Sequence, residues 1–169
     1  MSEFVNPNEV LEQLDLKKDM TAVDFGCGAG SWVIPLSKIL EDGLIFAIDV
    51  QETALSALEA NLKLHKITNI RKILGDVEYR ISALKDSSYD LVLMTNLLFQ
   101  AEDKKAVFEE AYRVLKKNSI LLVVDWTEES SLGPSISKAE IRNMGKETGF
   151  QIQKEFSAGD YHFAIIFKK

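Results

Sequence analysis

Three glycines at alternate positions, Gly26, Gly28 and Gly30, come directly after an apolar stretch that ends at Phe25. This order predicts a strand that turns sharply into a helix. At such a turn the first glycine can adopt a backbone conformation that is closed to residues with a Cβ, and the second leaves room for a ligand against the bare main chain. The third allows the following helix to pack close to the strand. We therefore expect a ligand that contains a nucleoside at this turn.

The spacing of these glycines distinguishes two classes of nucleoside cofactor. It is G-x-G-x-G, whereas dinucleotide-binding strands are followed by G-x-G-x-x-G. An acidic residue, Asp24, also lies two positions before the first glycine. Both features disfavour NAD.

The segment 24–30 resembles motif I of the class I S-adenosylmethionine (SAM) dependent methyltransferases, which reads D-x-G-x-G-x-G after a first strand. Two later acidic residues resemble further family positions in the same order. The apolar run 44–48 leads into Asp49, where the family holds the ribose hydroxyls. The run 70–74 leads to Asp76, where the family recognises the adenine amino group.

The resemblance continues through residues 89–96, which are similar to the family's fourth strand, and residues 112–124, which are similar to the helix-to-strand connection that follows. It therefore covers nearly the whole chain. It implies SAM as cofactor and S-adenosylhomocysteine as product. The cofactor-binding residues that it implies are Asp24, Gly26, Cys27, Gly28, Gly30, Asp49, Val50, Asp76, Val77, Asn96 and Leu97.

The family pattern also implies a role for each part of this set. Asp24 would hold the ammonium group of the methionine end, directly or through water, and Asp49 would accept hydrogen bonds from both ribose hydroxyls. Asp76 would accept from the adenine amine beside Val77. Asn96 and the leucine after it would close the methionine side.

The segment after the fourth strand bears on the methyl acceptor. Base N-methyltransferases often carry N/D-P-P-Y/F there, whereas this chain has Asn-Leu-Leu-Phe at 96–99. That segment, with Asp125 and Trp126 after the fifth strand, is most similar to the type 11, UbiE-like small-molecule branch. Phe99, Trp126 and Glu128 are candidates for the wall of the acceptor pocket, but for Glu128 and Glu129 a position on a surface loop is the favoured interpretation.

We expect a small-molecule acceptor of unidentified structure. An RNA or protein acceptor, and a module that binds SAM without catalysis, remain as alternatives. A basic patch at the carboxyl edge of the sheet would favour the polymeric acceptors. The net charge of −6 disfavours nucleic acid as a partner without excluding it.

Methyl transfer from a sulfonium is an in-line displacement that requires alignment and exclusion of water, so a dedicated base is optional. We place both histidines, His65 and His162, outside the carboxyl edge of the sheet, and we assign no catalytic residue and no metal ligand. On this view no single ionisable side chain controls turnover.

The 169 residues are expected to form one domain, 1–169, with a short helical segment at about 1–19. No apolar run is long enough to span a membrane and no signal peptide is recognised, so a soluble protein is expected. The single cysteine, Cys27, cannot form an internal disulfide and indicates a reducing compartment, the cytoplasm. A homodimer is left open.

Strand and helix patterns alternate along the chain. Near-continuous apolar runs at 44–50, 70–74, 91–94 and 120–124 indicate strands buried on both faces of a parallel sheet. Helical spacing marks the other segments, at 6–14, 31–40, 53–65, 104–117 and 137–148. Runs at 150–156 and 162–168 predict a hairpin, so one strand must be antiparallel. The expected fold is a single doubly wound α/β domain, Rossmann-like, and the resemblance implies seven strands in the order 3-2-1-4-5-7-6.

Overall fold

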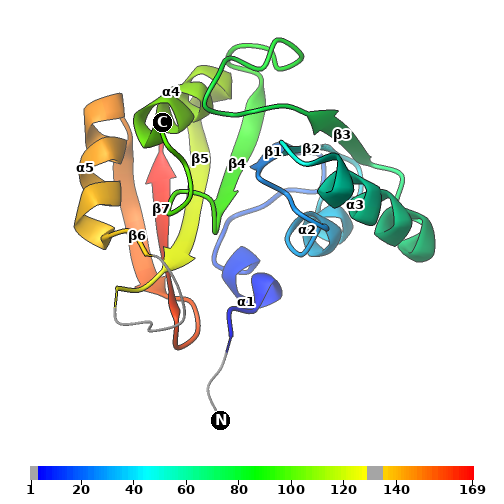
Figure 1. Cartoon of the computed structure of the whole chain (residues 1–169), viewed down its shortest axis with the longest axis horizontal. Coiled ribbons are helices and arrows are strands. Elements are labelled where there is room, and N and C mark those ends of the chain that lie inside the picture. Colours follow the sequence, from blue (N-terminus) through cyan, green and yellow to red (C-terminus); the bar gives the residue numbers. More distant parts are fainter. Residues whose placement is uncertain (1–3, 129–134) are drawn as a thin grey trace.

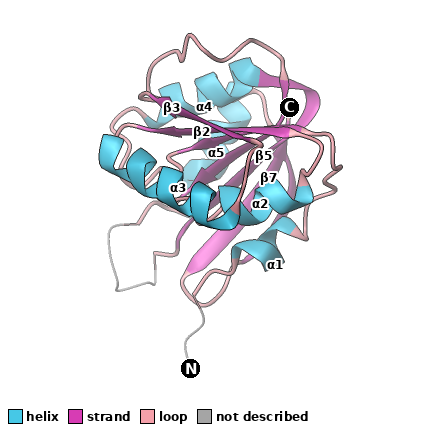
Figure 2. Cartoon of the chain, turned by 90° about the vertical axis from the view of Figure 1, so that its right-hand side faces the viewer, coloured by secondary structure: helices cyan, strands magenta, loops and turns pink. Residues whose placement is uncertain are grey.

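The computed structural model describes residues 4–128 and 135–169 and contains one mixed sheet with helices on both faces (Figures 1 and 2). None of the helices within the described residues is long and apolar enough to cross a lipid bilayer. The elements in chain order are α1 (Pro7–Leu11), β1 (Thr21–Phe25), α2 (Val33–Ile39), β2 (Leu44–Asp49), α3 (Glu52–His65), β3 (Ile70–Leu74), β4 (Tyr89–Thr95), α4 (Lys104–Val114), β5 (Leu115–Trp126), α5 (Lys138–Thr148), β6 (Gln151–Ser157) and β7 (His162–Lys168).

The seven strands lie in the order β3-β2-β1-β4-β5-β7-β6, which confirms the predicted topology. The first five strands in this order are parallel to one another, and β7 runs antiparallel to both β5 and β6. The expected hairpin is therefore present. The carboxyl ends of β1, β2, β3, β4 and β5 all lie at one edge of the sheet, where open α/β sheets bind their ligands.

Two hydrophobic cores follow from the alternation of side chains along the strands. In β1, Ala22 packs with α1, α2 and α3, whereas Val23 and Phe25 pack with α4 and α5 on the other face. The strand is buried on both faces because the helices cover both sides, as the apolar run predicts.

Three local expectations were wrong. β3 is an edge strand with exposed residues and is not buried on both faces, because only β2 pairs with it. The helix at 104–117 ends at Val114, since Leu115 is extended and pairs with Tyr89 of β4. The first helix ends at Leu11 and is shorter than the pattern over 6–14 predicted.

The connection between β3 and β4, residues 75–88, contains no helix, and a buried ion pair on α4 organises it instead. Arg113 donates to Glu110 of the same helix and to the carbonyl oxygens of Ile81 and Leu84. Glu110 in turn accepts from the Ile81 N–H at 2.9 Å. Both charged side chains are largely buried, at 15% and 6% exposure. Their hydrogen bonds raise the pKa of Arg113.

Replacing Arg113 with Ala should lower the free energy of unfolding by about 3 kcal/mol, because it leaves the Glu110 carboxylate buried without its partner. Denaturant unfolding measures this value. Arg80→Ala is the matched control, since Arg80 is exposed and pairs with Asp86, which Arg113 also contacts. An exposed pair of this kind is worth less than about 1 kcal/mol. Equal losses in the two variants would contradict the assigned role of Arg113.

Candidate functional site

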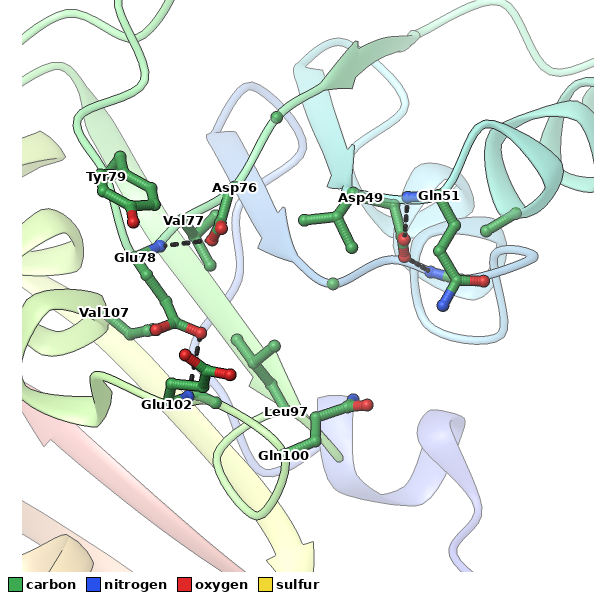
Figure 3. A pocket seen from close by; sticks show the side chains of 16 residues that line it. Asp49, Gln51, Asp76, Val77, Glu78, Tyr79, Leu97, Gln100, Glu102 and Val107 are labelled. Carbon is green, nitrogen blue, oxygen red and sulfur yellow. Dashed lines mark hydrogen bonds between the residues drawn. The ribbon is translucent and has the colours of Figure 1, made fainter.

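A cavity of about 580 Å³ opens at the carboxyl ends of β1, β2 and β3, beside the loop that follows β4 (Figure 3). Its volume lies in the range of small-molecule and cofactor sites. The residues that line it are Gly26, Gly28, Asp49, Val50, Gln51, Ala54, Gly75, Asp76, Val77, Glu78, Tyr79, Leu97, Gln100, Ala101, Glu102 and Val107. Seven of the eleven predicted cofactor-binding residues are among them, and Asp24, Cys27, Gly30 and Asn96 are not.

The glycine turn divides into residues that face the cavity and one that packs the fold. Gly26, Gly28 and Gly30 all have positive φ, at 78°, 53° and 102°. A Cβ added to Gly28 would have no heavy atom within 4 Å, so the main chain there is open to a ligand. A Cβ on Gly30 would lie 2.6 Å from Cδ1 of Leu58 on α3. Gly30 therefore allows close packing of α3 and does not line the cavity.

Asp49 lies at the end of β2, where its carboxylate faces both the glycine turn and the start of α3. One oxygen accepts from the Gly28 N–H at 2.9 Å, and the other accepts from the Gln51 N–H at 3.0 Å. Val50, which lies between Asp49 and Gln51 in the sequence, is 59% exposed and lines the cavity. A vicinal pair of hydroxyls on a ligand would meet this carboxylate in the cavity.

The opposite wall comes from the segment after β3. Asp76 accepts from the Glu78 N–H at 2.9 Å, and Val77 is buried beneath it. Glu78 extends across to the loop before α4, where its two oxygens accept from the N–H groups of Glu102 and Asp103 at 3.0 and 2.6 Å. Figure 3 shows the Glu78 and Glu102 side chains together on this side. Glu78 was not predicted as a site residue from the sequence, although it directly follows the predicted pair Asp76 and Val77.

Asp24 is the most unusual charged residue of the region. It is completely buried in β1, and neither carboxylate oxygen has a hydrogen-bond partner within the described chain. Burial, followed by the charge of Asp49, raises its pKa to about 7. An uncompensated buried carboxylate is costly, so this group suits a cationic partner.

The remaining predicted residues take different positions. Cys27 is buried in the turn, where burial raises the pKa of its thiol, so it packs as a small apolar side chain. Asn96 has a φ of 52°, and its side-chain oxygen is buried without a partner among residues 4–128 and 135–169. Its N–H donates to the Val124 carbonyl at 2.8 Å, which fixes it at the end of β4. Leu97 lines the cavity beside Gly26.

The predicted acceptor wall does not border this cavity. Phe99 packs against the core on the α4 face, and Glu128 is exposed. Trp126 packs on His162, with ring centroids 4.1 Å apart. Glu129 lies outside the described residues.

The two histidines differ from each other in position. His65 is the last residue of α3, beside the left-handed Lys66 that ends the helix, and is exposed as a solvated helix end would be. The placement of His162 away from the carboxyl edge was wrong. It begins the antiparallel strand β7, opposite Trp126 at the end of β5, so it lies at that edge.

Asp125 is a second buried carboxylate, on the opposite face of β5 from Trp126. Its oxygens accept from the Trp126 N–H at 2.9 Å and from the Leu98 N–H at 3.1 Å, which ties the loop after β4 to β5. Burial raises its pKa to about 6. These bonds give Asp125 a structural function that the sequence did not reveal.

The charge of the cavity restricts what it can hold. Its charged lining consists of four acidic residues, Asp49, Asp76, Glu78 and Glu102, with no lysine or arginine among the described residues that line it. A phosphate-bearing ligand would find no cationic partner there, whereas hydroxyl, amino and sulfonium groups would find carboxylates. The described residues also contain no group of three or more His, Cys, Asp or Glu side chains that could hold a metal ion.

Comparison with known proteins gives a family match. A family model described as a methyltransferase domain matches residues 16–159. The chain is 25% identical over 126 residues to a demethylmenaquinone methyltransferase from Geobacillus stearothermophilus, covering 74% of this chain and 53% of that protein. The chain thus spans about half the length of the curated relatives it matches.

Solved structures with the same fold include enzymes of different names. A SAM-dependent methyltransferase from Aquifex aeolicus superposes with a TM-score of 0.88 at 28% identity, over 97% of this chain and 89% of that one. The [4+2]-cyclase SpnF superposes with a TM-score of 0.85 at 13% identity, over 96% of this chain and 79% of that one. The likeness to SpnF concerns the fold alone, so the reaction of this chain must be inferred from the residues of its own cavity.

The buried Asp24 predicts that the ligand-free protein loses stability as pH rises. Its folded pKa of about 7 lies above the unfolded value of 3.8, so the proton binds more tightly in the folded state. The stabilisation that this proton gives the folded state is fully present below about pH 4. As the pH rises through 7 it is lost, which lowers the free energy of unfolding by about 4 kcal/mol. Denaturant unfolding at a series of pH values should therefore give a flatter profile for Asp24→Asn.

Asp15→Asn serves as the control for this measurement, because Asp15 is exposed. It should keep the pH profile of the parent protein. A parent profile that Asp24→Asn leaves unchanged would show that Asp24 ionises normally.

Proposed function

Because the chain belongs to the methyltransferase domain family, we propose that its cavity binds SAM and that it transfers the methyl group to a small-molecule acceptor. The observation that carries the proposal is the combination of an open glycine backbone at Gly28 with carboxylates on both sides of the cavity and no cationic lining. This combination suits a nucleoside that carries free hydroxyls and a positive charge, and it disfavours NAD and NADP, whose phosphates need donors or cations.

The fit of the residues assigns a role to each part of the cavity. Asp49 would bind the ribose hydroxyls, and Asp76 with Val77 would bind the adenine edge. Asp24 and Asn96, whose buried oxygens lack partners within the described residues, would bind the ammonium of the methionine end. Leu97 would pack against the methionine side.

The bound SAM would supply an electrophilic methyl group on a sulfonium. The protein would hold the donor in one orientation through the glycine turn and Asp49, with Asp24 and the buried side-chain oxygen of Asn96 at its methionine end. Alignment of this kind can supply a large part of the rate enhancement of a displacement reaction.

Two observations support the proposal that the methyl acceptor is a small molecule. The curated relatives that the chain matches include demethylmenaquinone methyltransferases, which act on a small molecule. The charged residues that line the cavity are acidic, so they offer no attraction to a phosphate backbone. We extend the proposal to the organisation of the chain, as one methyltransferase domain over residues 1–169, and to a reducing compartment such as the cytoplasm, which suits the free Cys27.

Replacing Asp49 with Ala should weaken SAM binding roughly tenfold to hundredfold, because a charged acceptor loses about 1.5 to 3 kcal/mol of hydrogen bonding to the ribose. Calorimetric titration with SAM measures this loss. Glu147→Ala, an exposed carboxylate on α5, is the control and should bind as the parent does. Equal affinity of Asp49→Ala and the parent would exclude Asp49 from the ribose site, and binding of NAD without SAM would exclude the proposed cofactor.

Two glycine variants should separate binding from folding. Gly28→Val should abolish SAM binding while most of the stability remains, because its side chain enters the open cavity. Its positive φ adds a strain of about 1 to 3 kcal/mol. Gly30→Ala should destabilise the fold more strongly, because its Cβ would overlap Leu58. Calorimetry and thermal melting distinguish the two effects. Undiminished binding by Gly28→Val would contradict the proposed turn.

A further inference from the structure

Three residues hold all the buried side-chain nitrogen and oxygen atoms that lack a hydrogen-bond partner within residues 4–128 and 135–169. They are Asp24, Asn96 and His162, and both ring nitrogens of His162 are included. An unmet buried polar group costs about 1 to 3 kcal/mol, so folded proteins keep few of them. All three lie at the carboxyl edge of the sheet, at the end of β1, after β4 and at the start of β7. Their common location indicates ligand contact at this edge.

The proposed cofactor roles account for Asp24 and Asn96 but leave His162 unexplained. Asn96 donates to the carbonyl of Val124, two residues before Trp126 on β5. His162 lies opposite Trp126 on the next strand, at the edge but on the far side of β5 from Asn96. Neighbouring strands are about 4.8 Å apart, so two strand spacings separate Asn96 from His162 by roughly 10 Å. The cofactor cavity lies on the β1 side of Asn96, and His162 lies on the β7 side.

The side chain that the structure places directly on His162 is aromatic. The indole of Trp126 packs on its imidazole with the two planes inclined by 37°, and Trp126 is only half-buried whereas His162 is 1% exposed. Two titratable residues next to this pair in sequence face other partners, since Asp125 binds the loop after β4 and the ring of Tyr161 packs on Phe4. Burial lowers the pKa of His162, so the imidazole is neutral near pH 7 and has one nitrogen free to accept a proton.

We propose that His162 and Trp126 form the acceptor site, in which a flat aromatic compound lies beside the stacked Trp126–His162 pair, packs edge-to-face against Trp126 and gives its hydroxyl proton to His162. The inference rests on the proposed function, because it places the acceptor across Asn96 from the methyl donor. A hydroxyl on an aromatic ring matches both partners, since the ring can pack edge-to-face with the indole and the hydroxyl can bond to an imidazole nitrogen.

The reaction balances without a further reagent. A lone pair on the hydroxyl oxygen forms the new bond to the methyl carbon as the carbon–sulfur bond breaks, and the electron pair of that bond remains on sulfur. The hydroxyl proton passes to a nitrogen of His162 and then to solvent. His162 acts as a general base, a role worth about 10² to 10⁴ in rate.

The first test uses fluorescence and requires no turnover. The chain has two tryptophans, so the Trp32→Phe protein reports on Trp126 alone. With S-adenosylhomocysteine bound, catechol should quench the Trp126 emission in a saturable way, whereas cyclohexanol, which lacks the flat ring, should not. Absence of saturable quenching by catechol would overturn the proposed site.

The second test measures transfer of labelled methyl from SAM to catechol. His162→Leu should lower kcat by about 10² to 10⁴, and His65→Leu, at the exposed end of α3, should match the parent. SAM affinity should be unchanged in both variants. The melting temperature of His162→Leu should be equal to or above that of the parent, because two unmet polar atoms are removed. His162→Gln, which keeps the size of the side chain and a polar group, should also lose activity.

Two results of the second test would overturn the inference: His162→Leu turnover within about threefold of the parent, or no labelled catechol from the parent protein. Calorimetry separates these results from failure of the proposed function. A parent that does not bind SAM would refute the proposed function itself, whereas SAM binding without a His162 effect would refute only the acceptor site.

Discussion

The site depends on hydrogen bonds that continue past the ends of the parallel strands. The N–H groups of Gly26 and Cys27 both donate to the Ile48 carbonyl, at 2.9 and 2.8 Å, and the next N–H, that of Gly28, donates to Asp49. Consecutive donors on one segment can converge in this way only where the backbone turns sharply, which the positive φ of Gly26 permits. The glycine turn is thereby fixed to β2, and every group in the cavity is placed relative to it.

The sequence was sufficient for the fold and for much of the cavity because both follow from local patterns. Apolar runs predict buried strands, and a polar residue directly after such a run, such as Asp49 or Asp76, must lie at the carboxyl edge. The spacing of residues in the sequence does not determine, however, how deeply each side chain is buried. Asp24 and Cys27 belong to the same motif as Gly28, but their side chains are buried and do not line the cavity surface.

The features that the sequence did not predict arise from pairing between distant segments. The ion pair of Arg113 with Glu110 holds residues 75–88 against α4, and nothing in either segment alone indicates this contact. His162 was misplaced for a similar reason. A residue at the start of a strand lies at the amino edge if that strand is parallel, and at the carboxyl edge if it is antiparallel. The direction of β7 therefore determines whether His162 can meet a substrate.

The carboxylate of Glu78 has a consequence for motion in the cavity. Because it accepts from two successive N–H groups before α4, it joins the segment after β3 to the loop after β4 at the rim of the cavity. The two segments must then fluctuate as one body, and widening of the cavity on this side requires both bonds to break together. If a nucleoside leaves through this side, its exchange is coupled to a local opening to which this one side chain contributes two hydrogen bonds.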